Sequence, residues 1–236
     1  FYASIAYCGS IWACASANEA QYRNKQIFYY RDLNDGKQGF KEDCPLTGIG
    51  FKKFVNDEDA FTQGGYRMDK TENTIRYAEM LLIYAEALNE LDGKYDVQSW
   101  DGTKTYTISR DIEEIKKGIH PVRIRAGLPD FAETDYLDKN VLRAKIKRER
   151  MIELLGEGKR YYDLRRWMDA PVEESQEIYG LNVFMTQANR DDFQVVIPTS
   201  NLQQTFAEKM YFWPVTFDEL KRNNLLVQSP GWRNYD

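Results

Sequence analysis

The sequence contains few of the residue types on which catalytic and metal sites usually depend. His120 is the single histidine among 236 residues, which excludes a site built on several histidine ligands within this chain. Zinc-type cysteine spacing, a phosphate-binding loop, a dinucleotide fingerprint and a nucleophile elbow are all absent from the sequence. Because His120 precedes Pro121 in a helix-like segment, we interpret it as a packing or surface residue. We expect no catalytic residue, no metal site and no cofactor.

Cysteine, positive charge and long apolar runs are also scarce. Cys8, Cys14 and Cys44 give an odd count, so two of them can pair in an oxidising compartment or all three can serve as small apolar side chains. The net charge of -5 provides no basic field for nucleic acid. No apolar run is long enough to span a bilayer. The first residue is Phe1 rather than methionine, as in a mature or cleaved product.

Aromatic and glycine residues are abundant in the first third of the sequence, 1–70. No helical period persists there, and long irregular segments in compact proteins tend to be functional loops. Aromatic faces stack on sugar rings, while amide side chains bind hydroxyl groups. We therefore name as candidate ligand-binding residues Trp12, Asn18, Gln21 and Tyr22. The alternative for each aromatic residue is ordinary core packing.

Helical periodicity is clearest in the second part of the sequence. Apolar residues at steps of three and four predict a helix over 76–91, followed by a polar loop over 94–107. A second helix is expected over 109–126, with Ser109 as its cap and a kink or split at Pro121. A third is expected over 136–156, with Arg148 on its buried track. Shorter helices are expected over 160–169 and 217–223, and two short strands over 181–185 and 193–197.

Three glutamates follow one another at intervals of four residues in the third helix and beyond it. Glu149, Glu153 and Glu157 repel one another at this spacing, so cationic partners are expected. The candidates are Arg160 and Arg165 just beyond the glycine break, with Arg123 and Arg125 on the preceding helix. The functional alternative is a carboxylate pair for glycoside hydrolysis. We favour a structural ion-pair cluster, because so many arginines disfavour a protonated acid.

Four segments of the sequence stand out as motifs. They are Ile-Arg-Tyr-Ala-Glu-Met-Leu-Leu-Ile-Tyr-Ala-Glu-Ala-Leu-Asn-Glu at 75–90, Val-Arg-Ile-Arg-Ala-Gly-Leu-Pro at 122–129, Ile-Lys-Arg-Glu-Arg at 146–150 continuing to Asp-Leu-Arg-Arg-Trp at 163–167, and Phe-Trp-Pro-Val at 212–215 followed by Gln-Ser-Pro-Gly-Trp at 228–232. In this order, the four segments resemble the motifs of the SusD/RagB family. Ser229, Val215 and Pro121 depart from the residues that the family usually has at these positions.

The resemblance implies a mainly α-helical fold of tetratricopeptide-like helix pairs with long loops and a small β-hairpin. It implies a Bacteroidetes-type outer-membrane lipoprotein that binds oligosaccharides or peptides at the cell surface and passes them to a SusC-type, TonB-dependent transporter. The chain, 1–236, would be the C-terminal portion of such a protein, with 1–70 loop-rich and ligand-facing and 71–236 carrying the helical motifs. The lipid-bearing cysteine would lie outside it.

Two other functions remain open at this point. One is an α-helical glycoside hydrolase that uses Glu149 or Glu153. The other is a tetratricopeptide-like adaptor that binds only protein partners. Because the aromatic first third and the four motifs together favour ligand capture, we expect a binding protein and not an enzyme.

Overall fold

The computed structural model describes residues 1–33, 35–37, 44–61, 64–199 and 202–233. Backbone contacts divide the chain into two units, one formed by 71–162 and one formed by 1–70 together with 163–236. Among the described residues, no helix is both long and apolar enough to cross a lipid bilayer.

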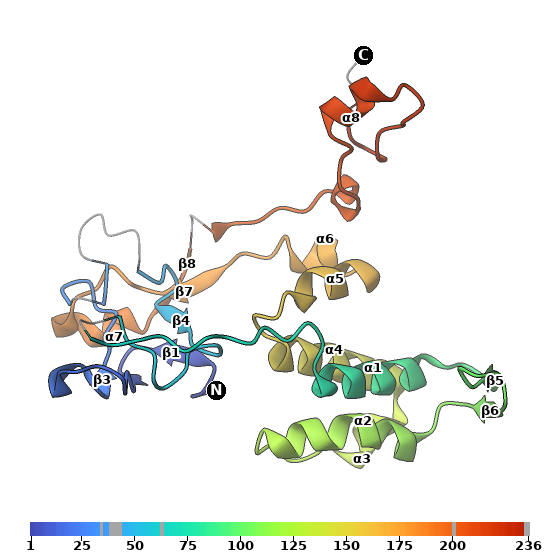
Figure 1. Ribbon diagram of the computed structural model, residues 1–236, viewed down its shortest axis with the longest axis horizontal. Coiled ribbons are helices and arrows are strands. Elements are labelled where there is room, and N and C mark those ends of the chain that lie inside the picture. The colour runs from blue at the N-terminus through green and yellow to red at the C-terminus, as the bar shows by residue number, and fades with distance from the viewer. Residues whose placement is uncertain (34, 38–43, 62–63, 200–201, 234–236) are drawn as a thin grey trace. The chain divides into compact units, whose positions relative to one another are not determined.

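The unit 71–162 is built around four helices and one hairpin. Helix α1 packs against both α2 and α4, and α3 packs against α4 (Figure 1). The expected mainly α-helical fold, with helix pairs and a small β-hairpin, is therefore confirmed. The elements are α1 (Tyr77–Glu90), β5 (Tyr95–Gln98), β6 (Thr105–Ile108), α2 (Ile112–Arg125), α3 (Glu133–Leu137) and α4 (Lys139–Glu153).

The helix ends differ from the predicted ones where an aspartate side chain caps a helix. Asp111, not Ser109, caps α2 by accepting hydrogen bonds from the backbone N–H groups of residues 113 and 114 at 2.8 and 3.1 Å. Asp138 caps α4 in the same way, which divides the expected third helix into α3 and α4. Of the predicted kink or split at Pro121, the split is wrong, because α2 runs through this residue. Proline removes a single N–H donor, while its buried neighbours Ile119 and Val122 hold the helix in place.

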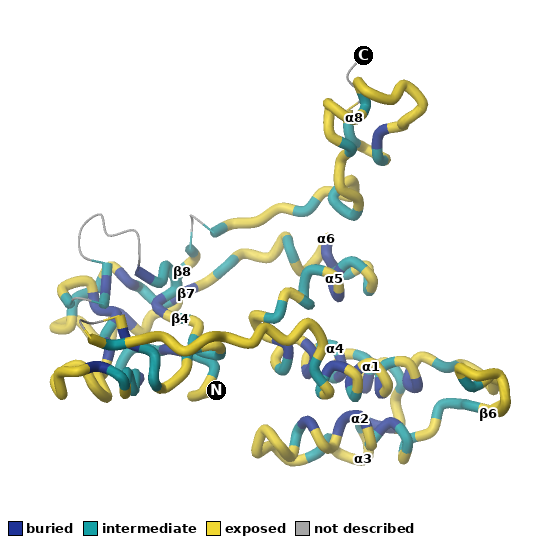
Figure 2. The backbone as a smooth tube through the Cα atoms, in the orientation of Figure 1, coloured by how far each residue is buried: buried dark blue, intermediate teal, exposed yellow. Residues whose placement is uncertain are grey.

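The core of this unit lies between α1, α2 and α4, whose buried stretches are seen in Figure 2. Gly118 allows the close approach of α1 and α2, because a Cβ atom there would lie 2.4 Å from the carbonyl oxygen of Leu81. The buried arginine of α4 is Arg150 and not Arg148, and Glu149 beside it is buried as well, so the predicted buried face is shifted around the helix. The core residues are Ala85, Leu88, Ile115, Ile119, Tyr136, Leu142 and Ile146.

The segment predicted as a polar loop over 94–107 contains an antiparallel hairpin instead. Tyr95 pairs with Ile108 and Val97 with Tyr106, so apolar side chains share one face and polar side chains the other. Asp101 fixes the turn by accepting hydrogen bonds from the Ser99 hydroxyl at 2.6 Å and the Thr103 backbone at 3.1 Å. The alternation was missed because polar residues outnumber apolar ones in this segment.

The second unit contains three further antiparallel strand pairs, β1–β4, β2–β3 and β7–β8. The expected pair at 181–185 and 193–197 exists but is displaced, because Val183 and Phe193 are buried beyond the strands and residues 190–193 are helical. The strands are β1 (Ile5–Tyr7), β2 (Ile11–Trp12), β3 (Lys25–Gln26), β4 (Ile49–Phe51), β7 (Tyr179–Leu181) and β8 (Val196–Pro198).

The helices of this unit are short, and α5 joins it to the preceding chain. A core of Ala6, Ile27, Tyr29, Tyr30, Val183 and Phe193 packs the early loops against the segment after β7. The helices are η1 (Ala20–Tyr22), α5 (Lys159–Arg166), α6 (Ala170–Glu173), η2 (Gln187–Asn189), α7 (Arg190–Phe193), η4 (Glu208–Tyr211) and α8 (Phe217–Arg222).

Candidate functional site

The three predicted glutamates lie in a network of arginines on neighbouring helices. Arg123 Nη1 lies 2.6 Å from Glu149 Oε2, and Arg125 Nη2 lies 2.5 Å from Glu153 Oε2. The side chains of Glu149, Glu153 and Glu157 are 7%, 10% and 6% exposed. Glu149 and Glu153 therefore link α4 to α2. All three carboxylates are nearly closed to solvent.

Arg76 is the partner that the sequence did not predict. It stands at the N-cap position of α1 and forms a two-pronged contact with Glu157, at 2.8 Å from Nε and 2.6 Å from Nη2. Its Nη2 also lies 3.0 Å from Glu153 Oε1. The hydrogen bonds with Glu157 raise the pKa of Arg76 above its usual value, although burial has the opposite effect. No local spacing indicates this contact, because 81 residues separate the two partners.

A second set of buried charges joins α1 to the end of α4 and the start of α5. Arg150 is 3% exposed and lies 3.9 Å from Glu79 and 3.8 Å from Glu86. Lys159 Nζ lies 3.0 Å from the second carboxylate oxygen of Glu79. Charged side chains thus hold the C-terminal end of α4 and the start of α5 against α1.

The two remaining predicted cations lie in α5. Arg160 is half-buried in its first turn. Arg165 pairs with Glu174 at 3.1 Å and stacks over Phe206 at 5.4 Å from the ring centroid. The roles assigned to Arg160 and Arg165 in the glutamate cluster stay predictions.

A cavity of about 280 Å³ lies beside this cluster, between α1 and α2. Arg76 and Arg125 line it, together with apolar residues of both helices, but the three glutamates do not. A glycosidase needs two carboxyl groups open to the sugar. The cluster therefore has the arrangement of a structural clamp.

Trp12, the first predicted ligand residue, is only partly available to a ligand. It lies in β2 and packs against the core around Ala6 and Ile27. Its ring nitrogen is buried without a hydrogen-bond partner among the described residues. Lys52 Nζ lies 5.9 Å from the ring centroid. One part of the Trp12 ring thus serves the core.

The other three predicted ligand residues lie on an exposed loop. Asn18 and Gln21 are exposed, and Tyr22, at the end of η1, is 38% exposed. Arg23 holds the loop in shape, because its Nε donates to the Ala17 carbonyl at 2.6 Å and its Nη2 to the Asn18 carbonyl at 3.3 Å. The loop therefore presents amide and phenol groups on a fixed backbone next to Trp12 in sequence.

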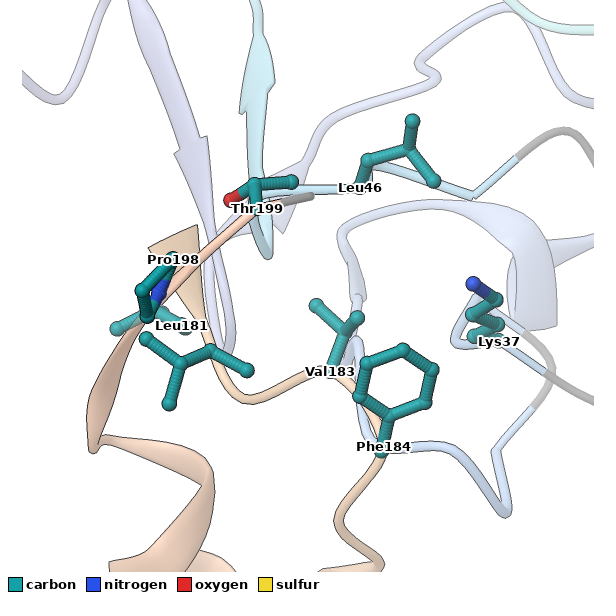
Figure 3. A pocket seen from close by; sticks show the side chains of 8 residues that line it. Lys37, Leu46, Leu181, Val183, Phe184, Pro198 and Thr199 are labelled. Carbon is teal, nitrogen blue, oxygen red and sulfur yellow. The ribbon is translucent and has the colours of Figure 1, made fainter. Parts of the chain in front are cut away.

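A small cavity near β7 and β8 is too narrow for a sugar ring. Its volume is about 50 Å³, whereas ligand pockets occupy roughly 300–1,000 Å³. Figure 3 shows the Phe184 ring and Lys37 at its edge, with Lys37 Nζ 4.7 Å from the ring centroid. It has room for a few water molecules only.

The chain is similar in sequence to proteins of one known family. The model of the SusD family matches residues 1–232. SusD-like protein P2 of Formosa agariphila is 33% identical over 163 residues, which make up 67% of this chain and 25% of the relative. SusD-like protein P38 of the same organism is 37% identical over 107 residues, 45% of this chain and 18% of the relative. The chain thus spans about a quarter or less of these curated relatives.

Solved structures agree with this match. A SusD-like protein (BF3747) from Bacteroides fragilis NCTC 9343 superposes with a TM-score of 0.73 at 28% identity, covering 98% of this chain and 38% of that one. The protein BT4246 superposes with a TM-score of 0.77 at 24% identity, covering 98% of this chain and 37% of that one. The second likeness shows the fold alone.

Proposed function

Because the chain belongs to the SusD family, we propose that the protein of which it forms a part binds oligosaccharides, or alternatively peptides, at the bacterial cell surface. A lipidated cysteine would anchor it to the outer membrane. The ligand would pass to a SusC-type, TonB-dependent transporter. The observation that carries the proposal is the family match over residues 1–232, which includes both the clamped helices and the aromatic loops.

The chain's two kinds of structure suggest a division of roles. Helices α1, α2 and α4, held by arginine–glutamate pairs, would form a rigid support. The loop-rich segment 1–70 would face the ligand, with Trp12 and Tyr22 stacking on sugar rings and Asn18 and Gln21 binding hydroxyl groups. The 71–236 segment would carry the family's scaffold motifs.

We further propose that the protein binds its ligand without converting it. Glu149 and Glu157, the most enclosed carboxylates of the cluster, are 7% and 6% exposed. A reacting sugar could not reach them without opening the helix packing. Binding then rests on stacking and hydrogen bonding at exposed loops.

Calorimetric titration of the full-length protein with a panel of neutral oligosaccharides and peptides tests the proposal. Replacing Tyr22 with alanine should weaken the preferred ligand by about twofold to tenfold, the range of one aromatic contact. Tyr162→Ala is the matched control, because Tyr162 is 68% exposed in the other unit. Binding that is unchanged in Tyr22→Ala would remove this loop from the site, and binding to no ligand class would contradict the proposal.

Trp12 needs a different variant, because its ring also belongs to the core. Trp12→Ala should lower stability as well as affinity, so loss of binding alone is not informative there. Trp12→Phe keeps an aromatic ring in the core and removes part of the stacking surface. We expect it to weaken binding by a smaller factor than Tyr22→Ala while the melting temperature stays close to that of the wild type.

The transporter partnership has its own test. A tagged full-length protein, purified from detergent-solubilised outer membranes, should bring with it a SusC-type transporter. Recovery of the protein without any large β-barrel component, under conditions that preserve other outer-membrane complexes, would contradict this part of the proposal.

A further inference from the structure

A cavity of about 610 Å³ in the second unit falls within the size range of ligand pockets. Three chain segments line it: the end of α5, the η4 segment with Phe212, and the tail turn at 230–231. None of its lining residues belongs to the loop from Trp12 to Tyr22. Neither the family match nor the relatives' names assign a role to it.

Hydrogen bonds fix two of the three walls, the tail turn and the η4 segment, against each other. The Trp232 ring nitrogen donates to the carbonyl oxygens of Lys209 and Phe212, each at 2.9 Å. Gly231 has a φ of +78°, and a Cβ atom there would lie 2.8 Å from the Cβ of Lys209, so glycine is needed for the tail to approach. Gln228 adds two bonds to the backbone of Val215, at 2.8 and 3.0 Å. A cavity with fixed walls loses little entropy when it binds a ligand.

The backbone at the α5 end of the cavity also carries strain. Met168, which lines the cavity, has a φ of +61°, a left-handed conformation that glycine normally occupies after a helix. For a residue with a side chain this conformation is costly, and such residues concentrate at binding sites. The Met168 side chain is 65% exposed, so an apolar group is held at the cavity edge instead of in the core.

Aromatic and apolar groups form one part of the lining. Phe212 is 57% exposed. The neighbouring Tyr211 ring packs edge-on against Phe206 at 4.9 Å, and its hydroxyl is buried without a hydrogen-bond partner among the described residues. Faces of this kind match the apolar side of a sugar ring.

Positive charge forms the other part. Arg165, Arg166 and Lys209 line the cavity with a single carboxylate, that of Glu208. Arg165 pairs with Glu174 at 3.1 Å and Arg166 with Asp163 at 2.8 Å, and neither of these two carboxylates lines the cavity. The Lys209 ammonium lies 4.6 Å from the Trp232 ring centroid, which keeps it near the cavity. Guanidinium and ammonium groups favour carboxylate and sulfate ligands.

We infer that this cavity binds a sugar residue that carries a carboxylate or sulfate group, with its ring against Phe212 and its anionic group toward Lys209 and the two arginines. The inference rests on the proposed function, because it names the class of sugar that such a protein would capture at a second site.

The test uses the full-length protein and three short oligosaccharides of equal length: a uronate oligomer, a sulfated oligomer and a neutral one. Lys209→Gln should weaken the uronate or the sulfated oligomer by about twofold to fivefold, as expected for one partly exposed charge contact. Phe212→Ala should weaken it by about twofold to tenfold. Salt at high concentration should weaken the anionic ligand and spare the neutral one.

The matched controls are Lys221→Gln and Phe217→Ala on α8, which lie outside the cavity lining. They should bind all three oligomers as the wild type does, and melting temperatures would identify any variant that fails to fold. A preference for the uronate or for the sulfated oligomer identifies the anionic group. Neutral binding without any anionic preference, with both cavity variants equal to their controls, would overturn the inference and leave the proposed function intact. Binding to none of the three would overturn the inference, while the panel of neutral oligosaccharides and peptides decides the proposed function separately.

Discussion

Replacing Arg76 tests whether the enclosed ion pairs of the helices contribute more to the free energy of unfolding than ordinary surface ion pairs do. The Arg76 side chain is 25% exposed, while its partners Glu157 and Glu153 are 6% and 10% exposed. Breaking a fully buried pair costs about 3–5 kcal/mol, and an exposed pair contributes about 0–1 kcal/mol. Arg76 lies between these limits, so Arg76→Gln should lower the free energy of unfolding by about 2–4 kcal/mol.

A double-mutant cycle isolates the pair itself. We expect Arg76→Gln and Glu157→Gln to couple by about 1.5–3 kcal/mol. The matched control is the pair of Arg143 and Glu90, which also joins α4 to α1 but has side chains 36% and 40% exposed. Its coupling should stay below about 1 kcal/mol.

Urea unfolding followed by far-ultraviolet circular dichroism measures both cycles, because the unit that contains α1, α2 and α4 supplies most of the helix. Equal coupling energies for the two pairs would show that burial does not strengthen the Arg76–Glu157 pair. The helices would then be held by apolar packing alone.

Two further changes test the packing and the electrostatics of the same unit. Gly118→Ala should destabilise this unit by about 1–3 kcal/mol in urea unfolding. Alanine has the better helix propensity, but its Cβ would lie 2.4 Å from the Leu81 carbonyl oxygen. Unchanged stability would contradict the tight contact. Burial raises the pKa of Asp130, but the hydrogen bonds from Tyr136 and His120 outweigh this effect and lower the pKa below its usual value. The ionised Asp130 carboxylate therefore stabilises the fold at pH values above the unfolded pKa of about 3.9. This stabilisation is lost as the pH falls through the lower pKa of the folded state. The stability gap between wild type and Asp130→Asn should therefore narrow below about pH 4, and parallel pH profiles would contradict this.

The helices were predictable because their information is local. The apolar steps of three and four that predicted 76–91 describe α1 (Tyr77–Glu90) closely. The cap of α2 was placed two residues early because Ser109 and Asp111 both suit the position, and only the backbone geometry selects between them. The hairpin at 95–108 was missed because its apolar face contains just four residues.

The partners of the glutamates were predictable only in part. Arg123 and Arg125 lie one helix away in a motif that local reasoning could pair with α4. Arg76 could not be found in this way, because its contact with Glu157 depends on how α1 packs against α4. The charged cavity lined by Lys209 and Phe212 is also a product of tertiary structure, since its three segments are far apart in sequence.

We propose that the full-length protein binds an oligosaccharide, or alternatively a peptide, and leaves it unchanged. One calorimetric titration of the full-length protein with its preferred oligosaccharide, in which each injection is followed until the heat signal is flat, tests this most directly. We expect heats that saturate and return to the baseline after every injection. A sustained heat that disappears in Glu153→Gln would show turnover at the buried carboxylates and would contradict binding without conversion.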